Sequence, residues 1–135
     1  MSRALSEKIR VANSRLIVEG DLDAADEYFA PDYVAHLTKR DMKGGPKAVR
    51  AFVSKLRSGF ADLVVDVEIL VESRDRVAWQ RTLRAEHAHD FMGFPATRRR
   101  IVWRDMVTSR FQGGLIAEEW SISDLAEQLL REREP

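Results

Sequence analysis

Hydrophobic residues recur at helical spacing through the first part of the chain, and this period predicts three helices. Gly20 is expected to end the first helix, and Asp21 to cap the second, which stops before Pro31. Pro46 suits the first turn of the third helix. The polar segment before it, residues 37–45, is predicted to be a loop. The predicted helices span about residues 6–19, 21–30 and 46–57.

From Leu63 onward the period changes to two, which is typical of β-strands. Residues 73–76 and the glycine pair at 113–114 are predicted turns, and residues 91–98 a loop. A last helix is expected over residues 125–133. The four predicted strands begin at about Leu63, Val77, Arg99 and Leu115.

Helices followed by an antiparallel meander indicate an α+β fold. The helices are expected to cover one face of a curved sheet, so that the sheet forms a cone with a pocket at its mouth. A length of 135 residues fits a single domain over residues 1–135. The open sheet face is expected to carry Val65, Val67 and Ile69 and to bury them against a second copy, which predicts a homodimer.

Charge and cysteine content narrow the class of protein. Basic and acidic residues number 22 each, and this balance argues against a nucleic-acid-binding protein. The absence of cysteine excludes disulfides and thiol chemistry, and it fits a reducing compartment. The first residues lack the apolar core of a secretion signal, and no apolar run reaches membrane-spanning length. We therefore expect a cytoplasmic protein with neither a membrane nor a nucleic acid as partner.

The stretch after the glycine pair carries the most informative pattern. Alternation predicts that Ile116, Glu118, Trp120, Ile122 and Asp124 share one strand face. A carboxylate on such an apolar face is either paired with another group or kept from water, and lack of water makes a carboxylate a stronger base. Asp124 also precedes the last predicted helix, so the alternative role for it is a helix N-cap.

Several segments together resemble the SnoaL-like polyketide cyclases, which belong to the nuclear transport factor 2-like superfamily of cone-shaped α+β proteins. The resemblance extends from about residue 20 to 128, and the Trp120-x-x-x-Asp124 ending contributes most to it. The segments that carry it are Tyr33–His36, Gly45–Val49, Ala61–Leu63, Glu86–His87, Asp90–Thr97 and Arg110–Asp124.

This resemblance implies an intramolecular aldol condensation that closes a ring on a polyketide ester, without a metal or a cofactor. The family's catalytic aspartate falls on Asp124, and two of its histidines fall on His87 and His36. Asp124 would then be the base, and His87 or His36 would hydrogen-bond the substrate carbonyl. The sequence departs from the family at Arg110, where the antibiotic-pathway cyclases have a second catalytic histidine.

The residues also suggest a pocket wall. Arg81 shares a strand face with Trp79 and His87, and it is expected either to pair with Glu118 or to anchor a carboxylate or ester of the ligand. Glu118 is alternatively a second acid. His87 and His89 point the same way, but a His-x-His pair is weak evidence for a metal, so we expect none. The predicted substrate-binding residues are Trp79, Arg81, Phe91, Met92, Phe94, Trp103, Glu118, Trp120 and Ile122.

These observations favour a cyclase- or isomerase-like enzyme that acts on a small hydrophobic carbonyl compound. A hydrolase or dehydratase on the same fold is a second hypothesis, since one fold hosts several reactions. A non-catalytic module for binding small molecules or for dimerisation is the third. Retained ligand affinity in Asp124→Asn without any turnover to lose would favour the third.

Overall fold

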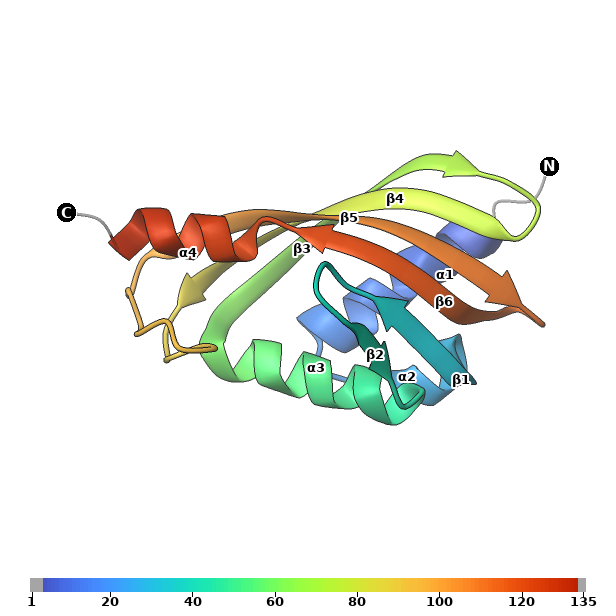
Figure 1. Ribbon diagram of the computed structural model, residues 1–135, viewed down its shortest axis with the longest axis horizontal. Coiled ribbons are helices and arrows are strands. Elements are labelled where there is room, and N and C mark those ends of the chain that lie inside the picture. The colour runs from blue at the N-terminus through green and yellow to red at the C-terminus, as the bar shows by residue number, and fades with distance from the viewer. Residues whose placement is uncertain (1–3, 134–135) are drawn as a thin grey trace.

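A six-stranded, mainly antiparallel sheet forms the centre of the computed structural model, which describes residues 4–133 (Figure 1). The α+β fold is confirmed. The strands are β1 (Phe29–His36), β2 (Asp41–Lys43), β3 (Phe60–Glu72), β4 (Arg76–His87), β5 (Arg100–Gln112) and β6 (Leu115–Ser123). The helices are α1 (Ala4–Asn13), its π-helical continuation η1 (Ser14–Val18), α2 (Ala24–Tyr28), α3 (Pro46–Gly59) and α4 (Leu125–Arg133).

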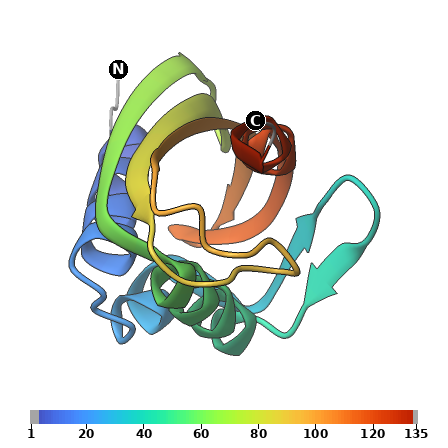
Figure 2. The same ribbon diagram turned by 90° about the vertical axis from the view of Figure 1, so that its left-hand side faces the viewer.

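The strand order is β2-β1-β6-β5-β4-β3. Strands β3 to β6 form the predicted antiparallel meander, while β1 joins the far side of β6 in parallel. The sheet curls around a central space without closing, and α1, η1, α2 and α3 lie at the inner side of the curve (Figure 2). None of the helices within residues 4–133 is long and apolar enough to cross a membrane.

The segment from residue 21 to 45 differs from the prediction. The second helix covers only Ala24–Tyr28, and the Asp21 carboxylate pairs with Arg15 at 2.6 Å instead of capping it. Pro31 lies inside β1, at the irregularity between Phe29 and Val34 in the pairing with β6, where its missing N–H is tolerated. The predicted loop contains β2, because the chain reverses after His36 and pairs with the end of β1.

A β-bulge in β6 overturns the predicted face. Arg110 pairs with Glu118 but Phe111 pairs with Ile116, so Ala117 is an extra residue and both Ile116 and Ala117 are buried. Beyond the bulge every side chain changes face. Trp120 and Ile122 are therefore 36% and 68% exposed on the outer face, and the prediction of a common face with Ile116 is wrong.

The residues predicted for the open face of the sheet are also wrong. Val65, Val67 and Ile69 are half-buried and pack against the core on the inner side of β3. A second bulge, at Leu70, then turns Val71 outward and Glu72 inward, where Glu72 accepts hydrogen bonds from Ser6 of α1. The large apolar side chains exposed on the outer sheet face are Val64, Leu70, Val71, Val102, Met106, Trp120 and Ile122.

Candidate functional site

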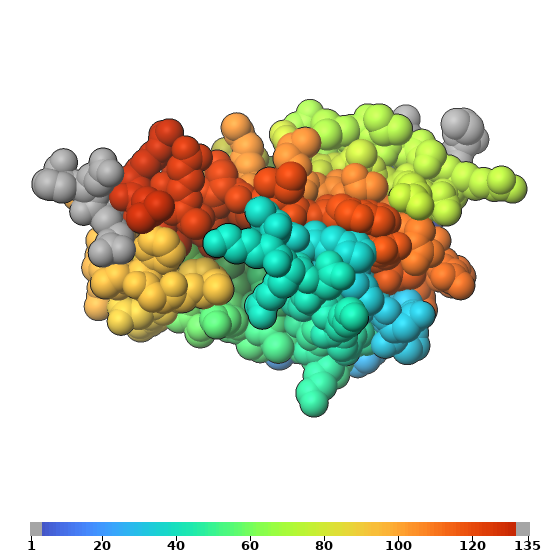
Figure 3. Space-filling view, viewed as in Figure 1, coloured from blue at the N-terminus to red at the C-terminus, as the bar shows by residue number. Residues whose placement is uncertain are grey.

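A cavity of about 640 Å³ lies between the inner face of the sheet and helices α1, η1 and α3. This volume is typical of small-molecule sites. Residues 37–40, the loop of residues 88–99 and α4 contribute to its mouth, and these segments surround one recess on the surface (Figure 3). The side chains that make the wall apolar are Ile9, Leu16, Ile17, Phe29, Val49, Val53, Leu56, Trp79, Leu83, Trp103, Val107 and Ile116.

Glu119 is the carboxylate that β6 presents to this cavity. Its Oε1 accepts a hydrogen bond from the Tyr33 hydroxyl at 2.6 Å, and its Oε2 accepts one from Ser109 Oγ at 2.5 Å. Trp79 Nε1 donates in turn to Ser109 Oγ at 2.9 Å. Desolvation by the surrounding protein raises the pKa of Glu119, although both hydrogen bonds and the charge of Arg81 act to lower it.

Tyr33 remains a hydrogen-bond donor in this arrangement. Its burial, followed by the nearby charge of Glu119, raises the pKa of the Tyr33 hydroxyl well above its ordinary value. The hydroxyl thus keeps its proton at any physiological pH, and the carboxyl of Glu119 is held in one orientation from both sides.

A second polar group in the wall is the ion pair of Arg81 and Asp105. Arg81 Nε donates to Asp105 Oδ2 at 2.7 Å, and Arg81 Nη1 donates to Asn13 Oδ1 at 2.8 Å. Asn13 is itself held by the bond from its Nδ2 to the Ile9 carbonyl at 2.9 Å. The alternative in which Arg81 pairs with Glu118 is therefore wrong, because Glu118 lies beyond the bulge on the outer face.

Asp124 follows the last residue of β6 and does not line the cavity. Its Oδ1 accepts a hydrogen bond from the backbone N–H of Arg104 at 2.7 Å, and its Oδ2 accepts one from Gln128 Nε2 at 3.2 Å. The backbone N–H of Leu125 is bound instead by Ser123 Oγ at 3.2 Å. The Asp124 side chain thus joins the start of α4 to β5.

His36 lies on the outer face with Glu118 and Trp120. Its Nδ1 lies 2.8 Å from Asp41 and its Nε2 2.5 Å from Glu118, and its ring stacks on Trp120 with centroids 5.3 Å apart. The hydrogen bonds that His36 donates to Glu118 and Asp41 raise the pKa of His36, and those that Glu118 accepts from His36 and Arg110 lower the pKa of Glu118. This cluster is separated from the cavity by the sheet.

His87 is buried at the end of β4, outside the cavity wall. Its ring stacks on Phe60 with centroids 5.2 Å apart, its Nδ1 accepts a bond from the Thr97 N–H at 3.3 Å, and its Nε2 has no partner among the described residues. Burial lowers the pKa of His87. His89 is exposed, and no group of three metal-ligating side chains is assembled within residues 4–133.

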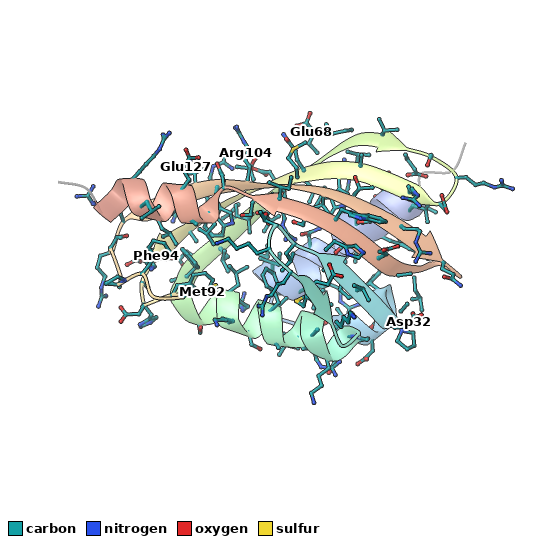
Figure 4. All side chains as sticks on the ribbon, viewed as in Figure 1. Asp32, Glu68, Met92, Phe94, Arg104 and Glu127 are labelled. Atoms are coloured by element: carbon teal, nitrogen blue, oxygen red, sulfur yellow. The ribbon has the colours of Figure 1, made fainter. Side chains whose placement is uncertain are left out.

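Six of the predicted substrate-binding residues line the cavity and three do not. Met92 and Phe94 lie in the loop beside the end of α3, whereas Glu68 and Arg104 extend from the outer face of the sheet (Figure 4). Those on the cavity wall are Trp79, Arg81, Phe91, Met92, Phe94 and Trp103, and those on the outer face are Glu118, Trp120 and Ile122.

Sequence reasoning missed both cavity carboxylates. Asp105 could have been predicted from the sequence, because it alternates with Trp103 and Val107 on one face of a regular strand. Glu119 could not have been predicted in this way, because strict alternation that starts at Ile116 assigns Glu119 to the face away from the cavity.

Comparison of the sequence with known protein families agrees with this architecture. A model of the SnoaL-like polyketide cyclases matches residues 7–131. The chain belongs to this family. No curated protein matches the sequence. Solved structures add three comparisons from different bacteria.

A protein from Acidithiobacillus ferrooxidans is 25% identical with a TM-score of 0.86, over 98% of this SnoaL-like chain and 96% of that one. IdmH from Streptomyces antibioticus is 28% identical with a TM-score of 0.78, over 96% and 97%. A SnoaL-like polyketide cyclase from Agrobacterium tumefaciens, at 21% identity and a TM-score of 0.77 over 96% and 98%, supports the fold alone.

Proposed function

We propose that this SnoaL-like protein is a cofactor-free enzyme that moves protons beside the carbonyl group of a small hydrophobic compound, and thereby closes a ring or isomerises it. The observation that carries the proposal is Glu119, a carboxylate withdrawn from bulk water in the wall of an apolar cavity, with a raised pKa. A base with such a pKa is better matched to carbon acids than an ordinary carboxylate.

In the proposed reaction, ionised Glu119 takes a proton from the carbon next to a carbonyl, and an enolate and a protonated Glu119 result. For ring closure, the enolate carbon forms the new C–C bond to a second carbonyl carbon of the same molecule. The alkoxide formed there receives the proton back from Glu119. The Arg81 cation, which lines the same cavity and whose charge also acts on Glu119, stabilises the oxygen on which negative charge develops.

Asp124, the base that the family resemblance implies, is the competing candidate for this role. It is not on the cavity wall, and its hydrogen bonds with Arg104 and Gln128 join α4 to β5. Glu119 has both the enclosure and the raised pKa that the reaction needs. We therefore assign the proton transfer to Glu119 and a structural role to Asp124.

Deuterium incorporation beside the carbonyl of 2-tetralone in D₂O tests this assignment, because it reports proton abstraction without knowledge of the natural substrate. Glu119→Gln should lower the NMR-measured exchange rate by about 10²- to 10⁴-fold. Asp124→Asn should leave the rate within about three-fold while lowering the thermal midpoint, through weakened contacts of α4. Loss of exchange in Asp124→Asn together with normal exchange in Glu119→Gln would reverse the assignment.

The two other hypotheses give different results in the same experiment. A hydrolase or dehydratase on this fold would release a distinguishable product from an ester, epoxide or hydroxyl compound. A binding module would bind 2-tetralone equally well in the wild type and in Glu119→Gln, and neither would exchange deuterium above the rate in buffer. The raised pKa of Glu119 favours an enzyme over a binding module, because functional sites are where such shifts concentrate.

We also propose that two copies pair through the outer face of the sheet. This face exposes large apolar side chains, among them Leu70, Met106 and Ile122, which border a shallow groove. Such a patch is unusual on a monomer, and a second copy of the same face would cover it.

A further inference from the structure

Asp105 carries an unused hydrogen-bond acceptor in the wall of the cavity. The residue is 5% exposed, and its Oδ2 is bound by Arg81 Nε. Its Oδ1 is buried and has no partner among the described residues. A carboxylate oxygen in an ion pair accepts hydrogen bonds and donates none, so the group that completes Oδ1 must be a donor.

Three other polar side chains of the cavity wall already have partners for their hydrogen bonds. Glu119 is bound at both oxygens, Asn13 both donates and accepts, and the Tyr33 hydroxyl is engaged with Glu119. The second buried polar atom without a partner in residues 4–133, His87 Nε2, is not on the cavity wall. The free acceptor is therefore a particular feature of Asp105, and it belongs to a residue that lines the cavity.

The surroundings of Asp105 indicate which donor fits. Arg81 already balances the charge of Asp105, and its positive charge would repel an ammonium group placed beside Oδ1, so a neutral hydroxyl group suits the site better. In the sheet, the Arg81–Asp105 pair lies between two apolar cross-strand pairs. These pairs are Leu83 with Trp103 and Trp79 with Val107, and all four residues line the cavity.

We infer that the ligand of this cavity bears a hydroxyl group beside an apolar portion, and that this hydroxyl donates a hydrogen bond to Asp105 Oδ1. Asp105 then selects hydroxylated ligands over their ethers, and Arg81 positions the Asp105 carboxylate. The inference rests on the proposed function in taking this cavity as the substrate site, but it concerns how a ligand is held and not how protons move.

Two matched probes separate the two parts of the interaction. 2-Naphthol and 2-methoxynaphthalene share a ring system and an oxygen, but only the first donates a hydrogen bond. Isothermal titration of the wild-type protein should give roughly ten-fold tighter binding for 2-naphthol, since the ether leaves the buried acceptor unpaired. Equal affinities, or no measurable binding of 2-naphthol, would overturn the inference.

Asp105→Asn is the decisive variant, because its amide oxygen can still accept from Arg81 while its NH₂ group replaces the free acceptor by a donor. The preference for 2-naphthol should fall to about one-fold. The control, Asp66→Asn, removes an exposed carboxylate paired with Arg84 on the outer face and should keep the preference. An unchanged preference in a folded Asp105→Asn would contradict the inference.

Should Asp105→Asn fail to fold, a crystal structure of the wild type with 6-bromo-2-naphthol decides the question, because the bromine fixes the ligand orientation. The hydroxyl oxygen should lie within hydrogen-bond distance of Asp105 Oδ1, and any other position overturns the inference. Glu119→Gln separates the two proposals. It should keep the preference for 2-naphthol even though it lowers the rate of deuterium exchange, so either proposal can fail while the other stands.

Discussion

At the scale of single residues, adjacent glutamates in β6 have opposite environments. Glu119 faces the cavity, where desolvation raises its pKa, and Glu118 faces outward, where hydrogen bonds from His36 and Arg110 lower its pKa. The difference arises because neighbouring side chains of a strand point to opposite faces. These two carboxyl groups are therefore expected to influence stability in opposite directions as the pH changes.

For Glu119 the folded pKa lies above the unfolded one, so its contribution to stability is fully present below the unfolded pKa of about 4.3 and is lost as the pH rises through the folded pKa. Glu119→Gln mimics the protonated acid and does not titrate. From about pH 4 to about pH 8, the thermal midpoint of this variant should therefore improve relative to the wild type. Scanning calorimetry across this range measures the difference.

Glu118→Gln is the matched control. The folded pKa of Glu118 is lowered, so its contribution is present above the unfolded pKa and is lost as the pH falls through the folded pKa. This variant should lose most relative stability at the higher pH values. Midpoints of both variants that run parallel to the wild type would show that neither environment differs from water.

A residue of the site can be predicted from the sequence where its strand is regular. Trp79, Arg81 and Trp103 lie on β4 and β5, whose pairing is continuous, so alternation assigns them to the cavity face. Trp120 and Ile122 lie beyond a bulge, and nothing in the local pattern marks Ala117 as the extra residue. One inserted residue reverses the assignment of the rest of a strand.

At the scale of elements, the loop of residues 88–99 is held at the cavity mouth by the end of β4. The backbone of His87 donates to the Arg99 carbonyl at 2.9 Å and accepts from the Arg98 N–H at 3.0 Å. The His87 ring also accepts from the Thr97 N–H. A residue that the family resemblance suggests for catalysis is thus in contact with the loop and apart from the cavity.

This arrangement predicts that acid loosens the loop. The folded pKa of His87 is lowered by burial, more than the charge of Asp90 raises it. The stability that neutral His87 provides is therefore present above the unfolded pKa of about 6.5 and is lost as the pH falls through the folded pKa. Amide hydrogen exchange in the loop, corrected for intrinsic rates, should accelerate below about pH 6 relative to β5.

His87→Phe should remove this pH dependence, although it also loosens the loop at every pH by removing an acceptor from Thr97. The exposed His89 provides the control, and His89→Phe should retain the wild-type profile. An identical pH profile in His87→Phe and the wild type would assign the effect to another group.

The elements themselves were predictable to different degrees. The meander and the helices at each end have long, regular periods, and the sequence predicts them within a few residues. Strands β1 and β2 have no such signal. Strand β1 contains Pro31 and β2 has three residues. Strand β1 pairs with β6, which is distant in sequence, and β2 lies at the sheet edge and pairs with β1. Tertiary contacts, not local preference, determine these two strands.

At the scale of the whole molecule, the sheet has one face covered by helices and one that is open. If two copies pair through the open face, a charge introduced among its apolar side chains should separate them. Ile122→Glu is expected to convert the dimer into a monomer in sedimentation velocity at micromolar concentration. Binding of 2-naphthol should persist, because Ile122 does not line the cavity.

Val18→Glu makes the same chemical change at an exposed position of η1, away from this face, and should leave the dimer intact. A wild-type protein that sediments only as a monomer would contradict the pairing.

The parallel contact between β1 and β6 has a consequence for biosynthesis. The register of this contact, in which Ala35 pairs with Glu119, brings the Tyr33 hydroxyl to the Glu119 carboxylate. Tyr33 and Glu119 are separated by most of the polypeptide. During translation, the edge of β1 that pairs with β6 stays uncovered until β6, the last strand, has left the ribosome. The carboxyl group and its phenol partner are thus united late in synthesis, so a nascent chain, or one truncated before β6, should lack the pair on which the proposed proton transfer depends.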